Sequence, residues 1–165
     1  IGTGSGCIAI ALAKNLLNAK VHALDISEKA LEVAKENAAN NAVEIEFWHA
    51  DILKRTDLGV KFDIIVSNPP YVRMLEKNQM QSNVVDNEPQ IALFVEDNDP
   101  LLFYRKIVEF AKTNLIDEGC LYFEFNQYLT QEIKTFLSEE DMVMELRKDI
   151  FGNDRMLKGR FKNSN

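Results

Sequence analysis

The first residues of the chain have the composition of a ligand-binding loop. Glycines alternate with hydroxyl residues in Gly2-Thr3-Gly4-Ser5-Gly6, and an Ala- and Leu-rich stretch at residues 8–17 predicts a helix directly after them. Glycine leaves no Cβ between the chain and a ligand, and a helix N-terminus presents free N–H groups. A dinucleotide fingerprint would need glycine at position 7, where this chain has Cys7. The loop is therefore interpreted either as a nucleoside site of another type or as a plain structural turn.

Two carboxylates follow predicted strands and could contact a nucleoside. Asp25 comes after the apolar residues 21–24, 19 positions beyond Gly6, and a carboxylate there can accept hydrogen bonds from both hydroxyls of a ribose. Asp51 follows a predicted strand at residues 44–48 and could meet an adenine amino group. The simpler alternatives are a helix-preceding cap for Asp25 and an ordinary loop carboxylate for Asp51.

A third candidate group, Asn68-Pro69-Pro70-Tyr71, follows the predicted strand at residues 62–66. The prolines fix φ and lack N–H donors, while Asn68 offers an amide acceptor and a donor pair. Tyr71 adds a flat apolar wall. This combination suits a planar substrate that carries an NH2 group, because acceptors can take both hydrogens while the nitrogen faces outward. The alternative is a plain turn that ends a strand.

Strands and helices alternate through most of the chain, so we expect an α/β fold. Ser27 is the predicted N-cap of a helix that ends near Asn40. Three branched aliphatics at residues 64–66 indicate a strand covered on both faces, and residues 68–99 indicate a long loop region. Gly119 is expected to precede a strand at residues 120–125. Further helices are expected at 101–115 and 129–137, and further strands at 142–149 and 156–161. We expect a doubly wound, mainly parallel sheet with a C-terminal antiparallel hairpin, and ligands beyond the carboxyl ends of its strands.

Length, charge and composition narrow the class of protein. The 165 residues carry 19 Lys and Arg against 26 Asp and Glu, a net charge of −7, and 46% of residues are hydrophobic. These values predict one globular domain, and the acidity disfavours direct nucleic-acid binding. No apolar run reaches the roughly 18–20 residues of a membrane helix, so no membrane association is expected. Cys7 and Cys120 cannot form a disulfide framework, which predicts a cytoplasmic protein. His22 and His49 lack a ligand partner at metal spacing, so no metal site is expected.

Several motifs together are similar to those of one enzyme family. The glycine loop resembles motif I of class I S-adenosylmethionine-dependent methyltransferases, and Asn68-Pro69-Pro70-Tyr71 resembles motif IV of those that modify amide or exocyclic amino nitrogens. Residues 87–93 (Asn-Glu-Pro-Gln-Ile-Ala-Leu), a strand ending in Glu124, and residues 149–155 (Asp-Ile-Phe-Gly-Asn-Asp-Arg) are more specific. They resemble the HemK/PrmC group, the protein-(glutamine-N5) methyltransferases of peptide-chain release factors. The resemblance spans essentially all 165 residues.

The resemblance implies a Rossmann-like fold, an activity and a set of site residues. The activity is methyl transfer from S-adenosylmethionine to the side-chain amide nitrogen of glutamine in a release factor's Gly-Gly-Gln motif, which leaves S-adenosylhomocysteine. The cofactor would contact Gly2-Thr3-Gly4-Ser5-Gly6, Asp25, Asp51, Ile52 and Asn68. Asn68, Pro69 and Tyr71 would carry the catalysis, with Pro70 joining them in holding the substrate.

The chain also departs from the family pattern. Family members usually have an acidic residue and a complete strand before the glycine loop, and an N-terminal helical domain that helps to bind the release factor. Residues 1–165 are therefore predicted to be the catalytic domain without that first strand and without the helical domain. Asn126 and Pro100 stand where the family often has glycine.

Two other functions stay open at this point. One is a nucleic-acid methyltransferase of the N6-adenine type, which could use the same pocket. The other is a catalytically impaired fragment that binds a nucleotide.

Overall fold

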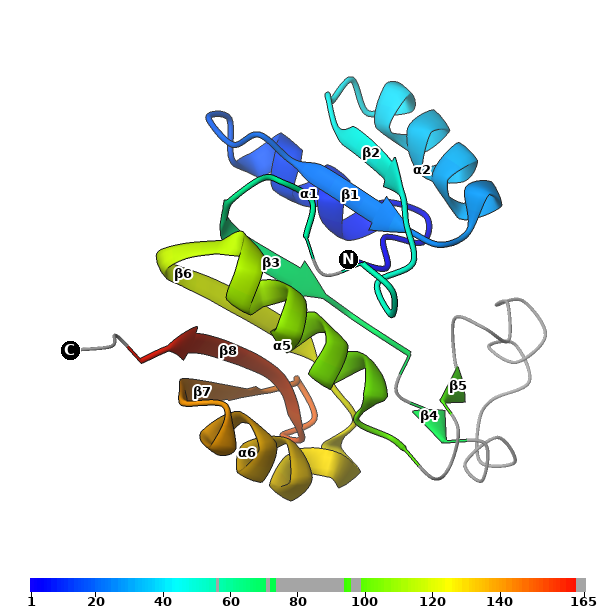
Figure 1. The fold of residues 1–165 in the computed structure, drawn as a ribbon. Helices are drawn as coiled ribbons and strands as arrows, with labels where there is room; N and C mark the ends of the chain where they lie inside the picture. The colour runs from blue at the N-terminus through cyan, green and yellow to red at the C-terminus, as the bar shows by residue number, and fades with distance from the viewer. Residues whose placement is uncertain (56, 71, 74–93, 96–98, 163–165) are drawn as a thin grey trace. The chain divides into compact units, whose positions relative to one another are not determined.

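The computed structural model describes residues 1–55, 57–70, 72–73, 94–95 and 99–162 (Figure 1). Over these ranges the protein is α/β, as the alternation of apolar stretches predicts. The chain divides into two compact units, Ile1–Arg55 and Thr56–Asn165, each with its own strands and helices.

The first unit contains a pair of parallel strands and two helices. Its elements are α1 (Cys7–Asn15), β1 (His22–Asp25), α2 (Glu28–Asn40) and β2 (Glu46–His49). The predicted cap of α2 is present, because the Ser27 hydroxyl accepts a hydrogen bond of 3.2 Å from the Ala30 N–H. The buried face of α2 carries Leu31, Ala34 and Ala38.

The second unit contains a mixed sheet with strand order β3-β6-β8-β7. Its elements are β3 (Phe62–Ser67), β4 (Val72–Arg73), β5 (Phe94–Val95), α5 (Leu102–Asn114), β6 (Leu115–Glu124), a 3-10 turn (Gln127–Leu129), α6 (Thr130–Glu139), β7 (Met142–Lys148) and β8 (Asp154–Phe161). β3 and β6 are parallel, and β8 runs antiparallel to both β6 and β7. The predicted C-terminal hairpin is thus confirmed. β4 and β5 form a separate parallel pair.

The core of the second unit forms between its helices and one face of the sheet. Tyr104 and Phe110 of α5, Phe125 after β6 and Leu137 of α6 are each at most 1% exposed. The ring of Tyr104 packs edge-on against Phe123, with 5.2 Å between centroids. Tyr104 and Phe123 thus pack together near the carboxyl end of β6, where we expect ligands to bind.

Two expectations about strands are wrong in detail. Ile64 is 50% exposed, so β3 is not covered on both faces along its whole length. β6 begins at Leu115 rather than at residue 120, with a register shift against β3 before Cys120. The cause is Asn114, whose buried amide donates to the Phe110 carbonyl and accepts from Leu58 N–H, so that α5 ends there and the chain is extended at once. The predicted loop region at 68–99 lies largely outside the described residues.

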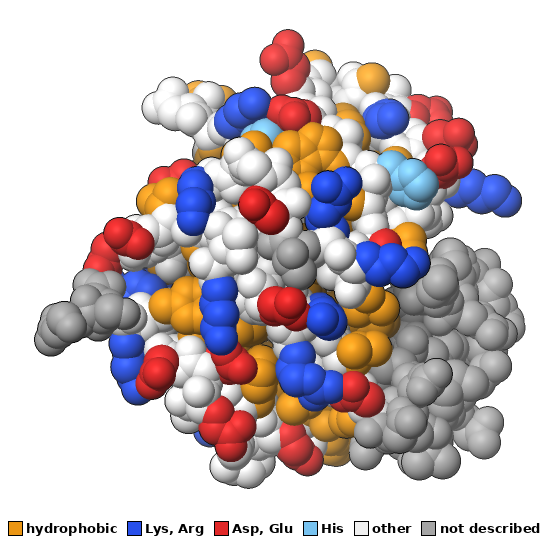
Figure 2. Space-filling view, in the orientation of Figure 1, with side chains coloured by type: hydrophobic (Ala, Val, Ile, Leu, Met, Phe, Trp, Pro, Cys, Tyr) orange, Lys and Arg blue, Asp and Glu red, His pale blue; other side chains and the backbone are white. Residues whose placement is uncertain are grey.

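Charged side chains of both signs cover the surface. On the face that Figure 2 shows, Lys and Arg are interspersed with Asp and Glu and do not gather into one basic area. Within the described part of the chain, no helix combines the length and the apolar character that crossing a membrane requires.

Candidate functional site

The glycine loop has the backbone conformation that its composition predicts. Gly2, Gly4 and Gly6 have φ of 67°, 54° and 85°, in the left-handed region that favours glycine. A Cβ at Gly2 or Gly4 would meet no atom within 4 Å, so open space lies beside both. A Cβ at Gly6 would lie 3.1 Å from the Ala34 Cβ, so Gly6 lets α1 approach α2 closely. The loop therefore combines open backbone with a tight helix contact.

Hydrogen bonds hold the loop against the neighbouring elements. The Thr3 N–H donates to the Leu24 carbonyl of β1 at 3.0 Å, and the Gly6 N–H donates to the Thr3 carbonyl at 2.9 Å. From α2, the Asn37 amide donates to the Ser5 carbonyl at 2.9 Å. Thr3 is half-buried and Ser5 exposed. The loop is thus anchored at both ends.

Asp25 ends β1 and joins it to the loop. Its Oδ2 accepts the Gly4 N–H at 2.8 Å, and its Oδ1 accepts the Ser27 N–H at 2.9 Å. The bond from the Ser27 N–H fits the simpler interpretation of Asp25 as a cap that precedes a helix. A carboxylate offers about four acceptor positions, so two bonds to backbone leave capacity for ligand hydroxyls.

Asp51 lies just after β2 and makes local contacts. Its Oδ1 accepts the Leu53 N–H at 3.0 Å, and its Oδ2 pairs with the Lys54 ammonium at 3.1 Å. Its neighbour Ile52 is 8% exposed. These bonds fit the interpretation of Asp51 as a loop carboxylate, and they leave its contact with a nucleoside a prediction.

The parallel pairing of β1 with β2 brings these groups to one edge of the first unit. Asp25 is in register with His49, and the Ala50 N–H donates to the Asp25 carbonyl at 3.0 Å. Asp51 follows immediately at the same carboxyl edge. The structure thus brings together the glycine loop and Asp25 in direct contact, with Asp51 at the same strand ends.

In the second unit, Asn68 directly follows the last residue of β3. Ser67 is 2% exposed and pairs with Phe123 of β6, whereas Asn68 itself is exposed. Pro69 is buried and Pro70 half-buried. Pro69 therefore packs against the unit while the neighbouring Asn68 stays exposed. Tyr71, the remaining member of this group, lies outside the described residues.

The glycine loop and Asn68 belong to different units. The glycine loop and the Asn68-Pro69-Pro70 segment each have the geometry described above within their own unit. Their meeting across a shared ligand remains a prediction.

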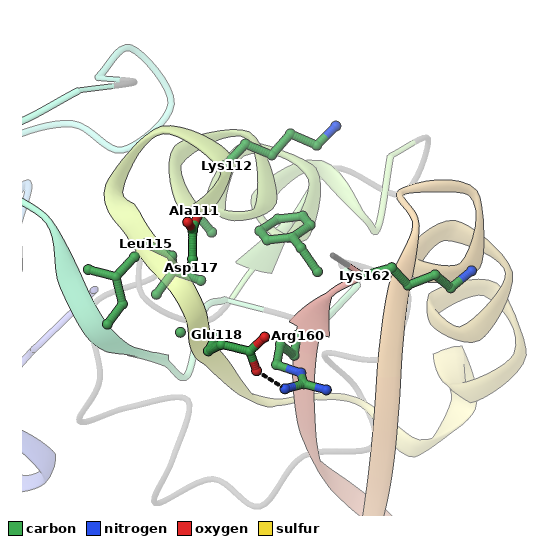
Figure 3. A pocket seen from close by; sticks show the side chains of 10 residues that line it. Ala111, Lys112, Leu115, Asp117, Glu118, Arg160 and Lys162 are labelled. Carbon is green, nitrogen blue, oxygen red and sulfur yellow. Dashed lines mark hydrogen bonds and ion pairs between the residues drawn. The ribbon is translucent and has the colours of Figure 1, made fainter. Parts of the chain in front are cut away.

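A cavity of about 550 Å3 lies at the amino end of β6 in the second unit. Figure 3 shows its lining, where Glu118 of β6 forms an ion pair with Arg160 of β8. Lys112 and Lys162 also line it. Asn68 follows the carboxyl end of β3, so the cavity and Asn68 lie at opposite ends of the same sheet. The mixed charges and ion pair give no reason to place the predicted chemistry in this cavity.

The two histidines have structural surroundings. The ring of His22 packs on Trp48, with 4.8 Å between centroids, and burial holds the pKa of His22 below its ordinary value. Glu46, 3.5 Å away, acts in the opposite direction on that pKa. His49 Nε2 lies 2.8 Å from the Ile26 carbonyl. His22 fits a packing role, and His49 is an exposed side chain with polar contacts at the surface.

Asp149 has a structural role that the tail motif did not predict. In the structure its carboxylate accepts the N–H groups of Phe151 and Asn153, each at 2.9 Å. The hairpin turn itself was expected, and the spacing Asp-x-Phe-Gly-Asn, an Asx residue before a glycine turn, could have revealed these hydrogen bonds.

Comparison with known proteins gives the family. The family model described as the methyltransferase small domain matches residues 1–146. The chain belongs to this methyltransferase family.

Curated relatives are named more narrowly than the family. This chain is 58% identical over 163 residues to the release factor glutamine methyltransferase of Flavobacterium psychrophilum, covering 98% of the chain and 57% of that relative. It is 49% identical over 160 residues to the protein of the same name from Bacteroides thetaiotaomicron, covering 95% and 57%. The resemblance expected from the motifs is confirmed. The chain spans somewhat more than half the length of these methyltransferases.

Solved methyltransferases share the fold. A methyltransferase from Pyrococcus furiosus matches with a TM-score of 0.70 at 20% identity, covering 98% of this chain and 73% of that chain. The ribosomal protein L11 methylase of Lactobacillus delbrueckii matches with a TM-score of 0.64 at 26% identity, covering 98% and 67%. The class I Rossmann-like methyltransferase fold predicted from the motifs is therefore confirmed.

Proposed function

We propose that this chain is the catalytic part of an enzyme that methylates a release factor. The acceptor is the side-chain amide nitrogen of the glutamine in a Gly-Gly-Gln motif, and the methyl donor is S-adenosylmethionine. The observation that carries the proposal is the 58% identity to a protein named release factor glutamine methyltransferase. An exposed asparagine, Asn68, follows β3 and would supply the hydrogen-bond acceptor that such a substrate needs. The cytoplasm, where release factors act in translation, is the proposed location.

The first unit fits the donor. Gly2 and Gly4 leave open space beside the backbone, α1 begins directly after the loop, and Asp25 offers a carboxylate whose position Gly4 fixes. Asp25 would accept the ribose hydroxyls, and Asp51 with Ile52 would hold the adenine. S-adenosylmethionine supplies an electrophilic methyl group on a sulfonium. Its product after transfer is S-adenosylhomocysteine.

The second unit would orient the acceptor. An amide nitrogen is a poor nucleophile, because its lone pair is delocalised into the carbonyl. Asn68 Oδ1 and the Pro69 carbonyl would accept the two N–H groups of the glutamine amide and point its nitrogen outward, with Pro70 and Tyr71 packing on the substrate. As the N–C bond to the methyl group forms and the S–C bond of the sulfonium breaks, the nitrogen would lose one proton to solvent water. Alignment of this kind can lower a barrier by about 7–11 kcal/mol in favourable cases.

The direct test follows the transferred methyl group. The complete natural protein is incubated with methyl-labelled S-adenosylmethionine and a purified release factor. We expect one label per release factor, located by mass spectrometry on the glutamine of Gly-Gly-Gln. A release factor with Gly-Gly-Ala is the control, and it should stay unlabelled. Equal labelling of that control, or none of the natural release factor, would refute the proposal.

The nucleic-acid alternative is disfavoured by charge and by the names of the relatives. A methyltransferase acting on nucleic acid should present basic side chains to phosphates, whereas this chain has a net charge of −7. The strand before the glycine loop and the N-terminal helical domain, both expected from the family pattern, remain predictions.

A further inference from the structure

The turn between β7 and β8 exposes two adjacent large apolar side chains. Ile150 is 93% exposed and Phe151 is 82% exposed. Single exposed apolar residues are ordinary, but a neighbouring pair at a turn is a candidate contact surface. We call Ile150 and Phe151 the apolar tip.

Hydrogen bonds fix the apolar tip in place. Asp149 Oδ1 accepts the N–H groups of Phe151 and Asn153 at 2.9 Å each, and its Oδ2 accepts the Asn153 amide at 3.3 Å. The Asp149 N–H donates in return to the Asn153 carbonyl at 2.8 Å. The Lys148 ammonium donates to the Gly152 carbonyl at 2.9 Å, and Gly152 has φ of 85°. A surface held this firmly loses little conformational freedom when a partner binds.

The strand register places the apolar tip at the end of the sheet that carries Asn68. Ser67, which precedes Asn68, pairs with Phe123 in the parallel β3–β6 ladder. Glu124, the next residue of β6, pairs with Met156 in the antiparallel β6–β8 ladder. The turn before β8 therefore lies at the carboxyl ends of β3 and β6, as can be followed in Figure 1.

Charges around the apolar tip are paired within the turn. Lys148 lies 3.4 Å from the carboxylate of Asp154, and Arg155 lies 3.8 Å from that of Asp149. This surface is apolar and flanked by balanced charge. It suits an uncharged polypeptide segment, because both described cations of the turn, Lys148 and Arg155, are already paired with carboxylates.

We propose that the apolar tip docks the polypeptide segment of the release factor that flanks the target glutamine. The inference rests on the proposed function and names a second contact of the same substrate. A segment held at Asn68 by its glutamine places its flanking residues at the same strand ends as the apolar tip, where an apolar side chain of that segment would pack on Ile150 and Phe151. The tip is thus expected to contribute to substrate affinity and not to the chemical step.

The experiment separates KM from kcat in the complete natural protein. Phe151→Ser and the double variant Ile150→Ser with Phe151→Ser are compared with Phe151→Leu, which keeps an apolar side chain. Val143→Ser is the matched control, because Val143 is 54% exposed in the same hairpin but pairs with Arg160 at its other end. We expect the serine variants to raise KM for the release factor at least tenfold, with kcat within twofold of the natural protein. Phe151→Leu and Val143→Ser should behave like the natural protein.

Two further measurements exclude other occupants of the apolar tip. Calorimetry with S-adenosylmethionine and thermal unfolding should give unchanged values for every variant. A lowered Tm with unchanged KM would show that the tip packs inside the natural protein. A dimer that Phe151→Ser dissociates, again with unchanged KM, would assign the tip to a second copy. Either result overturns the inference.

Failure of this inference can be told from failure of the proposed function. If the natural protein methylates the release factor and Asn68→Ala does not, but the tip variants keep their KM, the proposed function stands and the docking inference falls. If the natural protein does not methylate the release factor at all, both fall.

Discussion

At the scale of single residues, Asn68 carries the largest predicted effect on activity. We expect Asn68→Ala to lower kcat about 100-fold or more, because misplacing the acceptor by a small distance has effects of that order. The affinity for S-adenosylmethionine should change far less. Single-turnover methyl transfer and calorimetry measure the two quantities.

Asn40→Ala is the matched control for Asn68→Ala. Asn40 is an exposed asparagine at the end of α2. That variant should keep both kcat and cofactor affinity. A kcat for Asn68→Ala within a few-fold of the natural value would exclude Asn68 from the catalytic group.

Asp149 is predicted to make the β7–β8 turn sensitive to acid. The N–H of Asn153 is the main cause that holds the pKa of the Asp149 carboxyl below its ordinary value, with the N–H of Phe151 acting in the same direction. An unfolded Asp has a pKa of about 3.9, so the stabilisation is fully present above about pH 5 and is lost as pH falls through the lower folded pKa. We expect Asp149→Asn to lower Tm at pH 7, and this difference should shrink below about pH 4.

Asp117→Asn controls for the loss of one negative charge, because Asp117 is an exposed carboxylate of β6. The carboxyl carbon of Asp149, followed by NMR, should titrate below the unfolded value of about 3.9. A midpoint at or above that value would contradict the predicted effect.

At the scale of elements, the missing Cβ of Gly6 is predicted to permit the close packing of α1 on α2. Gly6→Ala combines a backbone cost of about 1–2 kcal/mol for its left-handed conformation with about 1–3 kcal/mol for the crowded Cβ. Gly4→Ala has only the backbone cost, because a Cβ there would meet no atom within 4 Å. Urea unfolding should therefore show a clearly larger loss for Gly6→Ala. Equal losses would mean that Ala34 moves aside without cost.

Elements were predictable where local chemistry decides them. The cap at Ser27 and the helix that follows depend on neighbours three and four residues apart, and the structure confirms both. The start of β6 was predicted wrongly. It depends on Asn114, whose side chain accepts a hydrogen bond from Leu58, 56 positions away. No local pattern reports such a bond.

At the scale of the whole molecule, the net charge of −7 predicts weak binding to nucleic acid. At about 150 mM salt we expect a dissociation constant for duplex DNA or an RNA hairpin no tighter than about 10⁻⁴ M, the weak end of non-specific binding. Band-shift titration measures this constant. Micromolar binding that weakens steeply with added salt would favour the nucleic-acid alternative.

The sequence by itself determined the α/β class, the glycine loop before a helix, the position of Asn68 at the end of a strand, and the family resemblance. These depend on periodicity, on residue type and on short spacings, which operate before the chain folds. Only the tertiary structure decided that Asp25 receives the Gly4 N–H, that Gly6 abuts Ala34, and that β8 lies between β6 and β7. It also decided that the apolar tip stands at the Asn68 end of its sheet. The reason is physical: such contacts join distant residues, and the packing of the whole unit selects them.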